Sequence, residues 1–119
     1  MMNEEIITRN EISHRIDVLL SKLNEKLTEH NKKHFQRLEP VKVNRDDGKK
    51  YTRLVQIRES GAGSAYGFIN LTTGDILKAA SWKAPAKGVR GNVNDYDYGL
   101  SCCDPYGVKY IRGGNVEWD

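Results

Sequence analysis

The chain has 119 residues, 38 % of them hydrophobic and 29 % charged, and its formal net charge at pH 7 is +3. This balance fits one folded domain over residues 1–119 and excludes a chain that is disordered throughout. The small charge excess argues against non-specific coating of DNA, and no run of about 18 apolar residues occurs, so no membrane span is predicted. The first residues, MMNEEIITRNE, are acidic and lack a continuous apolar core, which argues against a secretory signal.

Residues 3 to about 37 have the pattern of an amphipathic helix. Its apolar residues recur at spacings of three and four and form one stripe: Ile12, Ile16, Leu19, Leu20, Leu23 and Leu27. Pro40 closes the region, because proline disfavours a helical conformation at the residue before it. The stripe covers about two heptads, which is too short for a long coiled coil. It predicts packing on the chain's own sheet or on the helix of a second copy, and we expect a break near Asn31. Residues 1–39 are therefore interpreted as a helical oligomerisation arm.

After Pro40 the hydrophobic period becomes that of a β-strand. "VKV" is a short strand candidate, and Asp47-Gly48 is a turn signal. "YTRLVQIR", "AYGFINL" and "ILKAAS" predict an antiparallel meander from Tyr51 to Ala80, and a last strand is predicted at Tyr106–Arg112. The predicted fold class is α+β: an N-terminal helical arm, followed over residues 40–119 by a small antiparallel β-sheet with a long ligand-binding loop.

Cysteine and histidine give no strong signal for a metal or redox centre. Cys102 and Cys103 are adjacent and lack CxxC spacing, so they are interpreted as reduced thiols, with a redox pair or an intermolecular bridge as alternatives. His30 and His34 lie one helical turn apart, which suits a metal ligand pair. Because no acidic or thiol partner is evident, we interpret them as solvated residues of the helix face. We predict no cofactor and no metal.

The segment from Lys78 to Arg90 carries four basic residues and no acidic one: Lys78, Lys83, Lys87 and Arg90. Arginine and lysine attract phosphate, and Trp82 inside this segment offers a ring on which a base can stack. Asn92 can both donate and accept hydrogen bonds, which suits a base edge or a ribose hydroxyl. The pattern predicts a site for a small anionic ligand that contains a base. The alternative is that Trp82 is a core residue covering the sheet and that the basic residues are solvated.

The sequence favours a binding protein over an enzyme. No histidine follows His34, and no GxSxG elbow or Cys-His pair is present. Asp95 and Asp97, in "NDYDYG", could bind Mg²⁺ or a ribose, but a polar turn is the favoured interpretation. Nothing in the sequence pairs either aspartate with a nucleophile.

The stretch "YGFINLTTGDILKAASWKAPAKGVRGNVNDYDYGLSCCDPYGVKYIR" resembles the Thoeris anti-defence proteins of the first type, a family of small phage proteins. The resemblance covers about residues 65–112 and lies in "TGD-hydrophobic-L-K-A", an aromatic followed by "KAPAK", then "RGN" and "PYG". Family members can carry phenylalanine at the position of Trp82, and the doublet Cys102-Cys103 matches no rule of the family.

This resemblance implies a signal sponge that acts in the host cytoplasm. Such proteins bind glycocyclic ADP-ribose and other cyclic ADP-ribose isomers without cleaving them, and some members bind cyclic trinucleotides at a separate site. It also implies homo-oligomers, from dimers to hexamers, with the ligand pocket between protomers. Trp82 would stack on adenine and Asn92 would hydrogen-bond the ligand. Arg90 and Arg112 would face phosphates, with Lys83 and Lys87 in support.

Two other functions use the same features. A module that binds single-stranded nucleic acid would use the basic segment and Trp82. A phage protein–protein interaction module would use the helical stripe to bind a host partner. A nucleotide-processing enzyme is the least favoured function.

Overall fold

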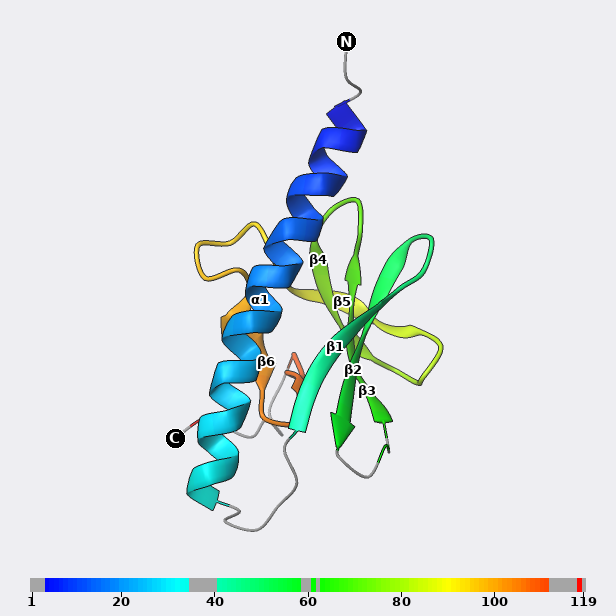
Figure 1. Cartoon of the computed structure of the whole chain (residues 1–119). Helices are drawn as coiled ribbons and strands as arrows, with labels where there is room; N and C mark the ends of the chain where they lie inside the picture. The colour runs from blue at the N-terminus through cyan, green and yellow to red at the C-terminus, as the bar shows by residue number, and fades with distance from the viewer. Residues whose placement is uncertain (1–3, 35–40, 59–60, 62, 112–117, 119) are drawn as a thin grey trace.

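The computed structural model describes residues 4–34, 41–58, 61, 63–111 and 118 (Figure 1). One long helix precedes a five-stranded sheet and a small two-stranded sheet, which confirms the α+β class. The elements are α1 (Glu4–His34), β1 (Val41–Asp47), β2 (Tyr51–Arg58), β3 (Gly63–Asn70), β4 (Asp75–Ala79), β5 (Pro85–Asn92), the 3₁₀ turn η1 (Leu100–Cys102), β6 (Cys103–Asp104) and β7 (Gly107–Val108).

The large sheet follows the chain, in the order β1-β2-β3-β4-β5, and every neighbouring pair is antiparallel. The meander from Tyr51 to Ala80 is confirmed as β2, β3 and β4. The candidate strand "VKV" extends to Asp47, where it turns into β2 as the Asp-Gly pair predicts.

The apolar stripe of α1 packs on one face of this sheet. Ile16, Leu19 and Leu23 are completely buried, in one cluster with the strand residues Leu54 and Ile69. Of the two predicted destinations, the chain's own sheet is therefore the one observed, and the stripe is covered within a single protomer. Figure 1 shows α1 lying along the sheet. The break expected near Asn31 is wrong, because α1 continues to His34.

Polar contacts fix the helix against the edge strand β1. The side-chain amide of Asn24 donates to the carbonyl oxygen of Val43 (3.0 Å) and accepts from the Val43 N–H (2.7 Å). Arg45 donates to Asp17 (2.9 Å) and to the carbonyl oxygen of Ser13 (3.0 Å). The Asn24 bonds satisfy backbone groups of Val43 that an edge strand otherwise exposes, and the Arg45 bonds attach the strand to the helix.

Two sequence predictions differ from the structure. The segment after β4 was expected to be a long loop, but residues 85–92 form β5. This strand lies at the sheet edge and none of its residues is buried, so it lacks the apolar alternation that marks a half-buried strand. The last strand was expected at Tyr106–Arg112, but β7 covers only Gly107–Val108 and pairs with β6. Arg112 lies outside the described residues.

The hairpin of β6 and β7 is held by one buried aspartate. The carboxylate of Asp104 accepts from the N–H groups of Tyr106 (2.7 Å) and Gly107 (2.9 Å). The buried Tyr66 hydroxyl donates to the carbonyl oxygen of Asp104 (2.6 Å). These polar bonds replace the long strand pairing that the apolar pattern predicted.

Gly67 allows this hairpin to lie against β3, and Gly67→Ala is expected to destabilise the protein. A Cβ at this position would overlap the Val108 side chain and would come within 2.9 Å of the Leu77 carbonyl oxygen. The carbonyl belongs to the backbone of β4, next to β3, and cannot move aside as a flexible side chain could. We therefore expect the free energy of unfolding to fall by about 1–3 kcal/mol. Urea denaturation measures this. Ser64→Ala, at an exposed position of the same strand, is the control and should change stability by less than about 0.5 kcal/mol. Equal stabilities of the two variants would contradict the packing argument.

Candidate functional site

Trp82 lies in the turn between β4 and β5 and is 46 % exposed, so the alternative of a core residue is wrong. The guanidinium of Arg53, from β2, lies over its ring with 4.4 Å between the guanidinium carbon and the ring centroid. Arg53 also forms an ion pair with Asp46 (2.8 Å). One face of the indole is therefore occupied by a cation from within the chain.

Asn92 lies at the other end of β5, where its side chain binds the protein itself. Its amide nitrogen donates to the carbonyl oxygen of Thr73 (3.0 Å) and to the carboxylate of Asp75 (2.9 Å). Its amide oxygen accepts from the Asn94 N–H (2.7 Å). These bonds join the end of β5 to the turn before β4, and they give Asn92 a structural role.

The predicted site residues that the structure describes do not all meet within one protomer, because Trp82 and Asn92 lie at opposite ends of β5. Trp82 lies just before Pro85, which pairs with Ala79, whereas Asn92 pairs with Asp75. The strand between the two ends has 8 residues and spans roughly 20 Å. Arg112 lies outside the described residues.

The basic residues of β5 differ in their surroundings. Arg90 donates from one guanidinium nitrogen to the carbonyl oxygens of Lys87 (3.0 Å) and Gly88 (2.6 Å) of its own strand. Gly88 has a φ of 98°, a conformation that favours glycine, which bends the strand at this point. The Lys87 side chain is exposed, and Lys83 lines a cavity beside the turn between β1 and β2.

The "NDYDYG" segment forms a polar turn, as favoured from the sequence. Asp95 accepts from the Asn92 N–H (3.1 Å), and Asp97 accepts from the N–H groups of Gly99 (3.0 Å) and Ser101 (2.9 Å). Partial burial opposes ionisation of Asp97, but these backbone donors outweigh it and lower the pKa of its carboxyl group. Both carboxylates thus stabilise the turn.

Cys102 and Cys103 are buried free thiols, in agreement with the interpretation as reduced cysteines. A hydrogen bond with Cys103, together with burial, raises the pKa of the Cys102 thiol. In the described part of the chain, no group of three His, Cys, Asp or Glu side chains is placed to hold a metal ion. No helix among the described residues is both long and apolar enough to cross a membrane.

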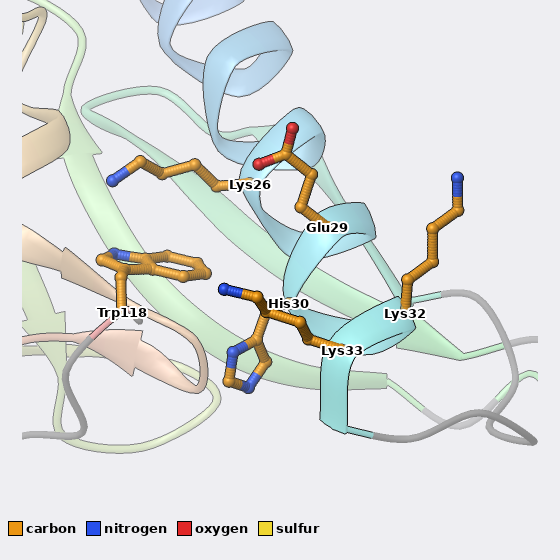
Figure 2. Close-up of a pocket in the computed structure, with 6 residues that line it drawn as sticks. All are labelled: Lys26, Glu29, His30, Lys32, Lys33 and Trp118. Atoms are coloured by element: carbon orange, nitrogen blue, oxygen red, sulfur yellow. The ribbon is translucent and has the colours of Figure 1, made fainter.

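A different cavity lies beside the last turns of α1 and was not found from the sequence. Its volume is about 340 Å³, within the range of small-ligand pockets. We call it the Trp118 pocket, and it is lined by Lys26, Glu29, His30, Lys32, Lys33 and Trp118. Figure 2 shows Lys26 and Lys33 reaching toward Trp118, whereas Glu29 and Lys32 point away.

The indole of Trp118 is fixed in place. Its N–H donates to the carbonyl oxygen of Cys103 (2.8 Å). The ammonium of Lys26 lies 5.1 Å from the ring centroid, and the His30 ring meets the indole edge-on at 5.7 Å. A flat apolar surface with cations at its border can stack a ring and attract a negative charge at the same time.

The prediction that His30 is a solvated residue of the helix face is wrong. Its ring is edge-on to Tyr106 (6.2 Å) as well as to Trp118, and both ring nitrogens are buried. A second cavity of about 240 Å³ also contacts His30, with Arg58 and Tyr106 among its lining residues. The sequence signal for this region was the spacing of Lys26, His30 and Lys33 by four and three, which places them on one helix face. No sequence pattern connects Trp118 with that face.

The chain matches the model of a family described as a family of unknown function, DUF7717, over residues 2–111, and it belongs to this family. The match includes α1 with its lysines, whereas Trp118 lies beyond it. No curated protein and no solved structure matches the chain.

Proposed function

We propose that this member of the DUF7717 family captures a small anionic molecule with a flat ring, such as a nucleotide, and holds it unchanged in the Trp118 pocket. One observation carries the proposal: a fixed indole borders a cavity of ligand size, and two lysines reach toward it. The ring of the ligand stacks on Trp118, in the place where Lys26 now lies. The Lys26 ammonium moves to the edge of the ligand, where the negative charge is.

Capture is the activity that suits the side chains of this pocket best. Its described lining holds three lysines, a histidine, a tryptophan and a glutamate, and the glutamate points away from the indole. Ammonium groups and aromatic rings bind and orient an anion. The described lining includes no serine, threonine or cysteine that would serve as a nucleophile.

The resemblance to Thoeris anti-defence proteins indicates which ligand to test first. It points to cyclic ADP-ribose isomers, and in particular to glycocyclic ADP-ribose, sequestered in the host cytoplasm. It also points to pockets between protomers. A pocket that combines Trp82 and Asn92 would need two protomers, because the two residues lie at opposite ends of β5. The Asn92 amide would then have to exchange its bonds to Thr73 and Asp75 for bonds to the ligand.

Recovery of the bound molecule tests the proposal directly. The protein is incubated with a mixture of cyclic ADP-ribose isomers, washed and heated, and the released molecule is analysed by mass spectrometry. We expect an isomer with unchanged mass and chromatographic retention. A linear or hydrolysed product would show that the protein is an enzyme. An eluate without a bound molecule would exclude cyclic ADP-ribose isomers as its ligands. Binding of an oligonucleotide instead, weakening steeply with salt, would favour the nucleic-acid module.

A further inference from the structure

A third cavity lies on the other side of the sheet from α1 and carries its own cluster of lysines. Its volume is about 400 Å³, and it lies between the turn joining β1 to β2 and the turn joining β4 to β5. The first turn contributes Lys49 and Lys50, and the second contributes Lys83. These two turns are far apart in the sequence, so the cluster is created by the fold.

The floor of this cavity is part of the sheet. Arg53 and Phe68 are directly opposite one another in the β2–β3 register, on the face away from α1. Tyr51 meets the Phe68 ring edge-on, with the ring centroids 6.3 Å apart. Strand residues therefore hold the floor in place, while the lysines extend from the turns above it.

Both acidic side chains at this cavity form ion pairs with arginine. Asp46 pairs with Arg53 (2.8 Å), and Asp47 pairs with Arg45 (2.9 Å). Partial burial raises the pKa of the Asp47 carboxyl, but the hydrogen bonds from Arg45 and Thr52 and the charge of Arg45 together outweigh it, so the pKa is lowered. Each aspartate therefore contacts an arginine and not a lysine, and Arg45 is shared with Asp17 (2.9 Å).

Lys49, Lys50 and Lys83 are all exposed, and the ion pairs among the described residues include none of them. The Lys50 ammonium lies 5.3 Å from the centroid of the Tyr51 ring, above the floor. The side chains that line the cavity therefore carry four positive and two negative charges, and the three lysines are the charges that stay outside the described ion pairs. Such an arrangement attracts a ligand that carries several negative charges close together.

We propose that this cavity, which we call the three-lysine cavity, binds a chain of adjacent phosphates. A single phosphate offers few negative oxygens to a cluster of three lysines from two separate turns. A linear chain of three phosphates presents negative oxygens along its whole length, and flexible lysine stems can follow it. The source is either free oligophosphate or the triphosphate of a nucleotide, whose base would contact Tyr51. The proposal is independent of the Trp118 pocket, because no residue lines both cavities.

Calorimetric titration at low ionic strength tests the proposal with the probes tripolyphosphate, ATP and inorganic phosphate. We expect tripolyphosphate to bind at least about 10-fold more tightly than inorganic phosphate. The double variant Lys49→Ala/Lys83→Ala should lose about 10-fold or more of that affinity, because it removes one charged contact from each turn. ATP and tripolyphosphate are compared in Trp118→Ala, so that the Trp118 pocket does not contribute. There, tighter binding of ATP identifies a nucleotide as the source, and equal affinity identifies the phosphate chain alone.

The control variant is Lys22→Ala/Lys42→Ala, which removes the same charge from exposed positions that do not line this cavity. Its affinity for tripolyphosphate should stay within about 3-fold of the unchanged protein. An equal loss in both double variants would mean a general charge effect and would overturn the proposal, as would equal affinities for inorganic phosphate and tripolyphosphate. Trp118→Ala separates the two sites: tripolyphosphate binding should persist in it whether or not the Trp118 pocket binds a nucleotide.

Discussion

Trp118→Ala is expected to weaken the binding of a cyclic ADP-ribose isomer by a factor of about 5 to 150. This factor corresponds to the loss of one stacked base, which is worth about 1–3 kcal/mol. The indole is held by its bond to Cys103 (2.8 Å), so it is ordered before the ligand arrives and little entropy is lost on binding. Isothermal titration calorimetry measures the change directly.

Trp82→Ala is the matched control, because it removes the other tryptophan of the chain. Since Arg53 already covers one face of Trp82, we expect this variant to keep its affinity within about twofold. The reverse result, with affinity lost in Trp82→Ala and kept in Trp118→Ala, would reject the Trp118 pocket. It would support instead the pocket between protomers that the resemblance implies.

Leu23→Ala is expected to lower the free energy of unfolding by about 2–5 kcal/mol. Leu23 is completely buried where α1 packs on the sheet, and removing its side chain leaves a cavity between the two layers. A domain of this size is stable by only about 5–15 kcal/mol, so the loss is a large part of the total. Chemical denaturation followed by circular dichroism gives the value.

Glu25→Ala serves as the control for this change, because Glu25 is exposed on the same helix. Alanine is a good helix former, so stability should change by less than about 0.5 kcal/mol. If Leu23→Ala were as stable as Glu25→Ala, the stripe would not be packed on the sheet of its own chain. The helix would then have to find its apolar partner in a second copy.

Local patterns predicted the main elements correctly. The stripe through Ile16 and Leu23 repeats at helical spacing, and "YTRLVQIR" contains the alternation of a strand, so both elements follow from the residues themselves. The polar turn around Asp97 was also predicted, because aspartate and glycine favour turns through their own backbone contacts. In each case the information lies within a few consecutive residues.

Such local patterns did not predict where the candidate site residues lie relative to one another. Trp82 and Asn92 are ten positions apart in the sequence, and a loop would have allowed them to meet. Pairing with β4 makes the segment between them a strand, which holds them at opposite ends. β5 is exposed at the sheet edge, where burial does not select apolar residues, so its sequence looks like that of a loop.

The sequence alone determined the class of fold and the buried face of its helix, because hydrophobic periodicity reports which residues must leave water. Only the tertiary structure decided which charged and aromatic groups share a cavity. Lys26 and Trp118 are separated by most of the chain, and Lys49 and Lys83 are separated by three strands. Whether these residues meet depends on how the layers pack. Contacts of this kind join residues from distant segments, and no short-range pattern records them.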